Sequence, residues 1–270
     1  MCARILFLGT AGDAMVAGKQ HRASGGVILD FDGTQFHVDP GPASLLMAKA
    51  ASVNLRENTA VFVTGNDMLR ANDVNAVISA MTHEGLDKIG VLVCPSSVAE
   101  EKENSQPFLN REHKNFLERM IIIDNTEKIG INDIDIEIIK LKEPVGKTCG
   151  YRFITQKFSI AYLPQTPYSS LIVDALKDTD IIIIGLKTPG ESKENEPMST
   201  KDAEKLINIV KPQLAVVTSF GVKMLQADPL YEAREIQRNT GIQVIAAKDG
   251  MTINPMSFTT TVRQKSLKGF

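Results

Sequence analysis

Hydrophobic and polar positions repeat with two different periods along the chain, and these periods distinguish strands from helices. Short apolar runs bounded by turn-forming residues predict strands, whereas apolar positions three or four residues apart predict helices. The two patterns meet in one stretch, where an apolar strand at 59–63 and a helix at 73–81 flank a polar turn at 64–72. Strand-to-helix turns often carry functional residues, so this turn is the first candidate for a site.

The rest of the chain mixes strands and helices in two halves of similar order. Asp32-Gly33 between two apolar runs predicts a hairpin turn, and the apolar run 180–185 predicts a strand buried on both faces. Ser199 and Asp202 fit a capping box that begins a helix. The predicted strands are 4–8, a hairpin at 25–39, 90–94, 134–138, a hairpin at 151–163, 180–185, 214–218 and 242–247, and the other predicted helices are 43–51, 108–116, 168–177, 199–210 and 229–240.

This order of elements predicts an α/β (α+β) protein with a single domain, 1–270. Because both halves supply strands and helices, we expect a four-layer αββα sandwich, in which two sheets face each other and helices cover their outer faces. The two halves would comprise about 1–145 and 146–256, followed by a basic C-terminal tail at 257–270.

Composition narrows the class of protein. The chain has 270 residues, of which 43% are hydrophobic, and this is enough for a large core. Its 30 basic and 32 acidic residues give a net charge of −2, so no broad electrostatic field favours nucleic acid or an anionic membrane. Cys2, Cys94 and Cys149 lack paired spacing, which favours reduced, packed thiols in a cytoplasmic protein. No apolar run reaches the roughly 18 residues of a membrane helix.

The turn at 64–72 resembles the signature of the metallo-β-lactamase superfamily, which reads Thr-His-x-His-x-Asp-His before a helix. Similar landmarks lie at 7–13, 34–41, 72–75, 150–153, 211–218 and 246–251. The resemblance covers nearly the whole chain and is closest in kind to stand-alone prokaryotic, archaeal-like members. It implies the four-layer sandwich, here as one metallo-β-lactamase-like domain.

Active members of that family hold two zinc, iron or manganese ions with His and Asp side chains, and a metal-bound hydroxide attacks the substrate. The resemblance places four residues at the first ligand cluster, in the order Gly65, Asp67, Leu69 and Arg70. It places three more at the next histidine, the bridging aspartate and the last histidine, namely Glu143, Gln165 and Ser219. Only Asp67 and Glu143 among these seven are metal donors, so we predict no metal ion, no other cofactor and no catalytic residue.

Arg70 suggests what replaced the metal ions. Its guanidinium cannot bind a metal, but its fixed positive charge would neutralise Asp67 and Glu143. We therefore expect an internal ion-pair cluster at this position. The alternative is that the motif drifted after function was lost, which would leave Arg70 solvated.

Other residues are weaker candidates. His21, His37, His83 and His113 lie outside the motif positions, and His37 and Asp39 are the best placed because they flank a strand end near the implied site. The segment 9–13 would expose backbone N–H groups to an anion, although it is ordinarily a strand-end turn in this family. Ser219 has no histidine beside it in any motif, which argues against a serine hydrolase.

Two functions remain open. The favoured one is a non-catalytic member, a pseudoenzyme that binds a protein partner, another copy of itself or a small anionic ligand in a cleft with Asp67, Arg70, Gln165 and Ser219. The alternative is a metal-dependent hydrolase of a phosphodiester, thioester or lactone, with a rebuilt site that uses Asp67, Glu143 or Asp39. Nucleic-acid binding is a third idea, supported only by the basic tail at 263–268.

Overall fold

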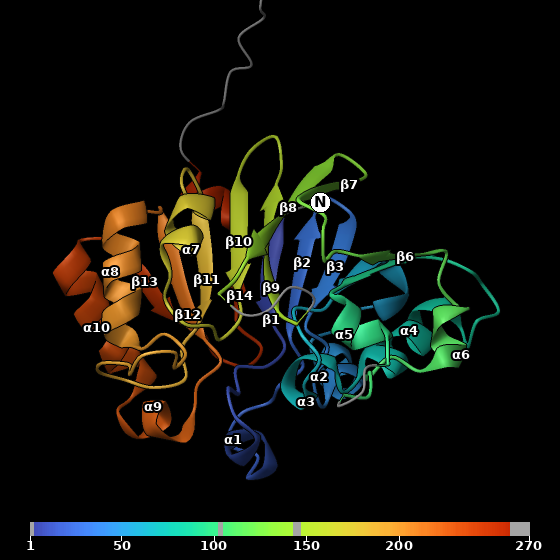
Figure 1. The fold of residues 1–270 in the computed structure, drawn as a ribbon, viewed down its shortest axis with the longest axis horizontal. Helices are drawn as coiled ribbons and strands as arrows, with labels where there is room; N and C mark the ends of the chain where they lie inside the picture. The colour runs from blue at the N-terminus through green and yellow to red at the C-terminus, as the bar shows by residue number, and fades with distance from the viewer. Residues whose placement is uncertain (1–2, 102–104, 143–146, 260–270) are drawn as a thin grey trace, which may run out of the picture.

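Two β-sheets face each other between two groups of helices (Figure 1). The computed structural model describes residues 3–101, 105–142 and 147–259. Helices α7, α8 and α10 lie on one side of the sheets, and α2, α4, α5 and α6 lie on the other. This arrangement confirms the four-layer αββα sandwich.

The first sheet has the strand order β14-β1-β2-β3-β4-β5-β6. Its strands are β1 (Arg4–Phe7), β2 (Val27–Phe31), β3 (Thr34–Val38), β4 (Asn58–Phe62), β5 (Val91–Cys94), β6 (Arg119–Ile122) and β14 (Thr252–Ile253). The predicted hairpin joins β2 to β3 through Asp32 and Gly33, whose φ angles of 55° and 100° suit a tight turn. Strands β3 to β6 are parallel.

The second sheet has the order β13-β12-β11-β10-β9-β8-β7. Its strands are β7 (Lys128–Ile131), β8 (Ile134–Lys140), β9 (Cys149–Ile154), β10 (Ser159–Leu163), β11 (Ile181–Gly185), β12 (Leu214–Thr218) and β13 (Val244–Ala246). Strands β10 to β13 are parallel, and β11 and β12 are buried along their whole length. The chain thus crosses from the first sheet to the second at residues 123–127 and returns to the first sheet to form β14. The division of a single domain into two halves stays a prediction.

Most helices cover the outer faces of the two sheets, whereas α1 and α9 lie beyond one end of the sheets and α3 lines the cleft described below. The helices are α1 (Ala14–Gly18), α2 (Ser44–Ala50), α3 (Met68–Ala71), α4 (Val74–Thr82), α5 (Ser96–Ala99), α6 (Arg111–Lys114), α7 (Ser170–Ala175), α8 (Thr200–Val210), α9 (Val222–Gln226) and α10 (Pro229–Thr240), with 3₁₀ turns at Leu55–Glu57 and Pro255–Phe258. Helix α8 begins with the predicted capping box of Ser199 and Asp202.

The predicted helices 108–116 and 168–177 are wrong in extent, since only α6 and α7 form within them. The backbone N–H of Phe108 donates to the side chain of Asn66 at 3.0 Å, and that of Asn110 donates to Asn75 at 2.9 Å. Leu109 between them donates its backbone N–H to the carbonyl oxygen of Val98 at 3.2 Å, and Asn110 is extended, with φ −68° and ψ 149°, so the helix begins only at Arg111.

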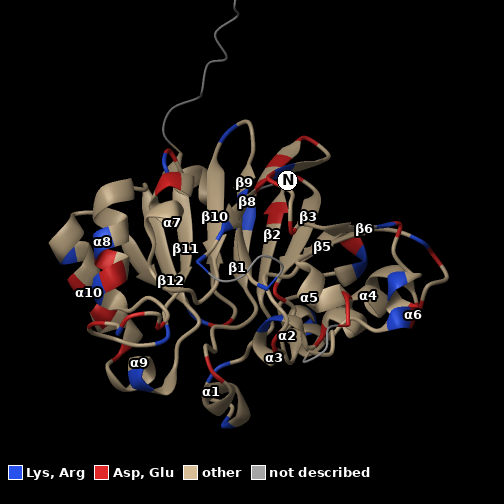
Figure 2. Ribbon diagram, viewed as in Figure 1, with Lys and Arg blue, Asp and Glu red and all other residues tan. Residues whose placement is uncertain are grey.

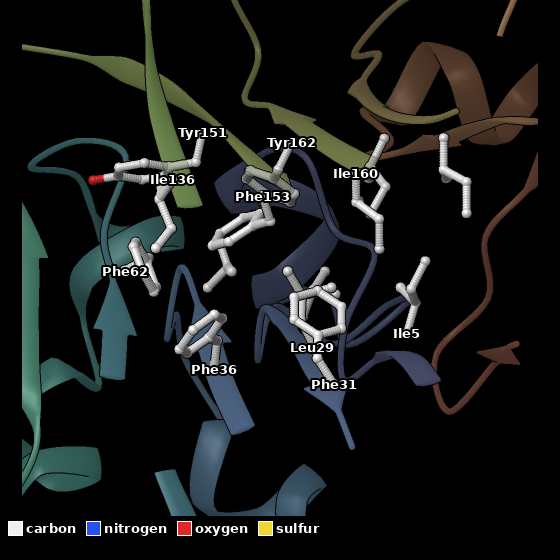
Figure 3. Close-up of a cluster of buried hydrophobic side chains, with 14 of the residues drawn as sticks. Ile5, Leu29, Phe31, Phe36, Phe62, Ile136, Tyr151, Phe153, Ile160 and Tyr162 are labelled. Carbon is white, nitrogen blue, oxygen red and sulfur yellow. The ribbon is translucent and has the colours of Figure 1, made fainter. Parts of the chain in front are cut away.

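Aromatic side chains fill the space between the sheets (Figure 3). The ring of Phe153 in the second sheet lies 5.0 Å from that of Phe62 in the first, and Tyr151 lies 5.1 Å from Phe62. The buried hydroxyl of Tyr151 donates to the carbonyl oxygens of Val63, at 2.8 Å, and Val93, at 3.2 Å. A side chain of one sheet therefore holds the strand ends of the other.

We expect Tyr151→Phe to lower the free energy of unfolding by about 1 to 2 kcal/mol, because both carbonyl oxygens lose a buried donor while the ring still fills its space. Urea denaturation measures the change. Phe153→Leu, which removes ring packing but no hydrogen bond, serves as the contrasting variant. An unfolding midpoint for Tyr151→Phe equal to that of the parent protein would show that these bonds add nothing.

Both described cysteines, Cys94 and Cys149, are buried, in agreement with packed thiols. Burial raises the pKa of Cys149 to about 12. Basic and acidic residues are interspersed over the surface, for example on α8 and α10 (Figure 2). No helix in the described ranges has the length and apolar character needed to cross a bilayer.

Candidate functional site

A cleft of about 460 Å³ lies where the carboxyl ends of parallel strands from both sheets come together. The first sheet contributes the ends of β3 and β4, and the second contributes those of β10, β11 and β12. Six of the eight residues predicted for the site line this cleft, namely Asp39, Asp67, Leu69, Arg70, Gln165 and Ser219. Gly65 lies beside the guanidinium of Arg70, and Glu143 lies outside the described residues.

Asp67 and Arg70 form an ion pair across the single turn of α3. Asp67 begins the helix by accepting a hydrogen bond from the backbone N–H of Leu69 at 3.0 Å, and its other oxygen pairs with Nε of Arg70. Nη1 of Arg70 lies 3.5 Å from Oγ1 of Thr64. Only 23% of the Arg70 side chain is exposed. Arg70 is therefore turned inward, and the alternative of a solvated arginine does not hold.

Gly65 provides the space that the Arg70 guanidinium occupies. A Cβ atom added at Gly65 would lie 2.9 Å from Cζ and from Nη1 of Arg70, closer than real Cβ contacts. No backbone atom is among those neighbours, so the arginine is the group that restricts this position. The glycine and the arginine fit each other as a pair.

We expect Gly65→Ala to destabilise the protein by about 1 kcal/mol when Arg70 is present and to be nearly neutral in an Arg70→Ala background. The methyl group pushes the guanidinium away from Asp67 only if a guanidinium is there. A double-mutant cycle from urea denaturation measures the coupling. Equal effects of Gly65→Ala in both backgrounds would contradict the pairing.

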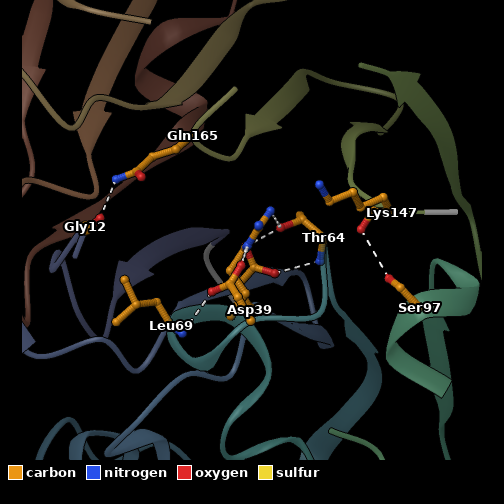
Figure 4. Close-up of polar contacts among 9 residues, drawn as sticks. Gly12, Asp39, Thr64, Leu69, Ser97, Lys147 and Gln165 are labelled. Carbon is orange, nitrogen blue, oxygen red and sulfur yellow. Dashed lines mark hydrogen bonds and ion pairs between the residues drawn. The ribbon is translucent and has the colours of Figure 1, made fainter. Parts of the chain in front are cut away.

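Asp39 is a buried carboxyl group between the ion pair and the core, with 2% of its surface exposed. It accepts hydrogen bonds from the backbone N–H of Thr64 at 2.7 Å and from its hydroxyl at 2.8 Å (Figure 4). Burial raises the pKa of Asp39 to about 6, although the charge of Arg70 and the Thr64 hydrogen bonds act in the opposite direction. Burial also raises the pKa of Tyr162, and the charge of nearby Asp39 adds to this.

Gln165 joins two loops at the floor of the cleft. Its Nε2 donates to the carbonyl oxygen of Gly12 at 2.7 Å (Figure 4) and to that of Ser219 at 2.8 Å. The loops are in tight contact, since a Cβ at Gly12 would lie 1.7 Å from the Ser219 carbonyl oxygen. The bridging-aspartate position of the family thus carries an amide that donates hydrogen bonds within the protein.

The weaker sequence candidates lie elsewhere or have structural partners. His37 is buried beneath the cleft floor with Nε2 2.8 Å from the carbonyl oxygen of Gly25, and burial lowers its pKa to about 4. In the segment 9–13, the carboxylate of Asp13 accepts from the backbone N–H groups of Val16, at 2.8 Å, and Val222, at 3.1 Å. The backbone N–H groups of Gly9, Ala11 and Gly12 donate to backbone carbonyl oxygens of the protein, so they are not directed at an anion. No histidine lines the cleft beside Ser219 among the described residues.

Three ionisable residues of the cleft lie outside the positions that the motif comparison gives, namely Asp13, Tyr162 and Lys187. Tyr162 lies at the end of β10, and Lys187 lies just after β11. Ligands of open parallel sheets bind at the carboxyl ends of the strands, and this rule applied to the run 180–185 would have indicated Lys187.

The side chains at the expected metal-ligand positions do not fit the pair of metal ions that the resemblance implies. Within the ranges 3–101, 105–142 and 147–259, no three His, Cys, Asp or Glu side chains lie together in a way that would hold a metal ion. Leu69 offers no donor atom, and the Gln165 amide is used in hydrogen bonds to two carbonyl oxygens. A guanidinium, which bears a permanent positive charge, lies where the motif places the last ligand of its first cluster.

Comparisons with known proteins agree with this fold. The family model of the beta-lactamase superfamily domain matches residues 34–220, more than half of the chain. An uncharacterized protein of Methanocaldococcus jannaschii is 26% identical over 257 residues, which cover 94% of this chain and 95% of that protein.

Two solved structures share the fold at low sequence identity. The metallo-beta-lactamase fold protein YhfI from Bacillus subtilis matches with a TM-score of 0.75 and 14% identity, over 93% of this chain and 98% of that one. A diphosphatase from the PhnP family matches with a TM-score of 0.67 and 16% identity, over 94% and 97%. The chain therefore belongs to the beta-lactamase superfamily and has the metallo-β-lactamase fold.

Proposed function

We propose that this chain is a non-catalytic member of the superfamily, in which Arg70 replaces the metal ions and the cleft binds a ligand. One observation carries the proposal. The guanidinium of Arg70 lies over Gly65 and pairs with Asp67, so a cation that belongs to the protein occupies the first ligand cluster of the family motif.

The chemistry of the neighbouring groups supports the proposal. Hydrolysis in this family needs a metal-bound hydroxide, and the positions of its ligands hold a glycine, a leucine, an amide and a hydroxyl. Asp39, a second carboxyl group of the cleft, already accepts two hydrogen bonds from Thr64. It is held as a structural acceptor and has little capacity left to activate water.

The competing function is a hydrolase with a rebuilt metal site, and metal analysis separates the two. We expect protein prepared without chelators to contain less than about 0.1 equivalent of zinc, iron or manganese, as befits an incomplete ligand set. Added Zn²⁺ or Mn²⁺ should leave its melting temperature unchanged, because a ligand stabilises only a state that binds it.

The same preparation, tested for hydrolysis of bis(4-nitrophenyl) phosphate before and after EDTA, completes the experiment. About one or two equivalents of metal per chain, together with hydrolysis that EDTA abolishes, would overturn the proposal in favour of the hydrolase. Metal below that level with no EDTA-sensitive turnover supports it. A sizing column run on the same sample reports whether another copy or another protein is bound.

A further inference from the structure

The charged groups of the cleft differ in whether they have hydrogen-bond or ion-pair partners within the protein. This difference indicates the kind of ligand that the cleft binds. Among the described residues, the three carboxyl groups that line the cleft each have protein donors on both oxygens. Asp13 accepts from Val16 and Val222, Asp39 accepts twice from Thr64, and Asp67 accepts from Leu69 and pairs with Arg70. These carboxyl groups therefore interact with donors of the protein and not with a ligand.

Lys187 is the exception. It follows β11 of the second sheet and lines the cleft. Among the described residues, no carboxylate lies within ion-pair distance of its ammonium group. Lys187 as a residue is partly buried, and a lysine ammonium without a counter-ion favours an anion beside it.

The position of Lys187 is fixed by its neighbours. The Lys187 carbonyl oxygen accepts from the backbone N–H of Gly221 at 3.1 Å. A Cβ at Gly221 would lie 2.8 Å from Cγ of Lys187, so the glycine allows the aliphatic part of the lysine to pack closely against the chain. This packing restricts the aliphatic part of the Lys187 side chain. The side chain therefore loses less conformational entropy when its ammonium group binds an anion.

The rest of the cleft is suited to an uncharged group. Leu69, Met68 and Pro164 supply apolar surface, while the hydroxyl of Ser219 adds a polar group close to the floor. The volume of about 460 Å³ lies within the range of sites for small molecules. It is large enough for more than an inorganic ion.

We propose that the cleft binds a small organic anion, whose carboxylate or phosphate group pairs with Lys187 and whose apolar part contacts Leu69 and Met68. This rests on the proposed function, since it requires that no metal ions occupy the cleft. The charged group would link the second sheet, through Lys187, to the first, through Arg70 and its helix α3.

Isothermal titration of the full chain tests the site with phenyl phosphate and phenylacetate as probes and benzylamine as the cationic counterpart. We expect one of the two anions to bind and benzylamine not to bind. Lys187→Ala should weaken that binding about tenfold, as expected for a hydrogen bond to a charged group, and Lys187→Arg should restore most of it. Lys223→Ala removes the same charge from an exposed position on α9 and should have no effect.

Preference between the two anions identifies the charged group as phosphate or carboxylate. Binding that is equal for benzylamine, unchanged by Lys187→Ala, or absent for both anions would overturn the proposal. Melting curves of the variants show that they are folded. The metal content is measured separately, so a metal-free protein that binds neither anion would contradict only this inference, whereas metal at stoichiometric level would contradict the proposed function.

Discussion

A variant with Gly65→His, Asp67→His, Leu69→Asp and Arg70→His should bind about one equivalent of Zn²⁺, although the parent chain should bind none. The four changes restore the ligand types of the family motif on the same turn and helix. Removal of Arg70 is what makes the site possible, because the three atoms nearest to a Cβ added at Gly65 all belong to that guanidinium. The four changes restore only part of the seven ligand positions, so we expect less than the roughly 10 kcal/mol of a complete four-ligand zinc site, but even half of this corresponds to more than a thousandfold in affinity.

Competition with a fluorescent zinc indicator measures this affinity. Arg70→His alone is the matched control, since it removes the guanidinium but adds a single ligand, and it should bind zinc far more weakly than the fourfold variant. Zinc affinity in the fourfold variant no greater than in the parent would show that more than the loss of these ligands separates this chain from a metal site.

Arg70→Leu should destabilise the protein by about 2 kcal/mol near pH 8 and by less than about 1 kcal/mol near pH 5. The buried carboxylate of Asp39 loses its nearest positive charge, whereas the exposed part of Asp67 can be solvated. The cost therefore depends on whether Asp39 is ionised.

The direction of this pH dependence follows from the two pKa values of Asp39. Its pKa is near 3.8 when exposed and about 6 in the fold, so the folded protein holds the proton more tightly and its stability falls as the pH rises between those values. Loss of Arg70 raises the folded pKa further and extends this fall above pH 6. At pH 5 Asp39 is protonated in the fold with or without Arg70, and the difference shrinks.

Urea denaturation of the parent and of Arg70→Leu at both pH values measures the effect. His37, whose pKa is lowered to about 4, also changes stability with pH, but it is present in both proteins and cancels in the difference. Asp39→Asn is the matched control, because Arg70→Leu in that background should lose its pH dependence. A destabilisation that is the same at pH 5 and pH 8 would rule out Asp39 as the group that Arg70 stabilises.

The sequence was a good guide to elements whose signals are local. The hairpin at Asp32-Gly33 and the capping box of Ser199 and Asp202 depend on a few adjacent residues, and the structure has both. The helix at 108–116 was overestimated because Asn110 is extended and its segment is bonded to Asn66 and Asn75, which are more than thirty residues away. No periodicity within a segment reports donors and acceptors at that distance.

The residues of the site likewise divide into those that a local motif predicts and those that depend on how distant strands meet. The motif comparison brought Asp67, Leu69 and Arg70 together because they share one turn, and the structure places them in the cleft. Lys187 and Tyr162 come from the other sheet, and their presence follows only from how the strand ends meet. The fit between Gly65 and Arg70 depends on the rotamer of the arginine, which a sequence does not contain.

The hydrogen bonds of Gln165 also bear on whether the ancestral chemistry can return. An aspartate at that position has no N–H to give, so it would face the carbonyl oxygens of Gly12 and Ser219 with a negative charge. A lineage that regained this ligand first would lose a structural link before any metal could bind and compensate for it. If the proposed function is correct, we therefore expect the single change Gln165→Asp to destabilise the protein, which would make the metal-free site difficult to reverse one residue at a time.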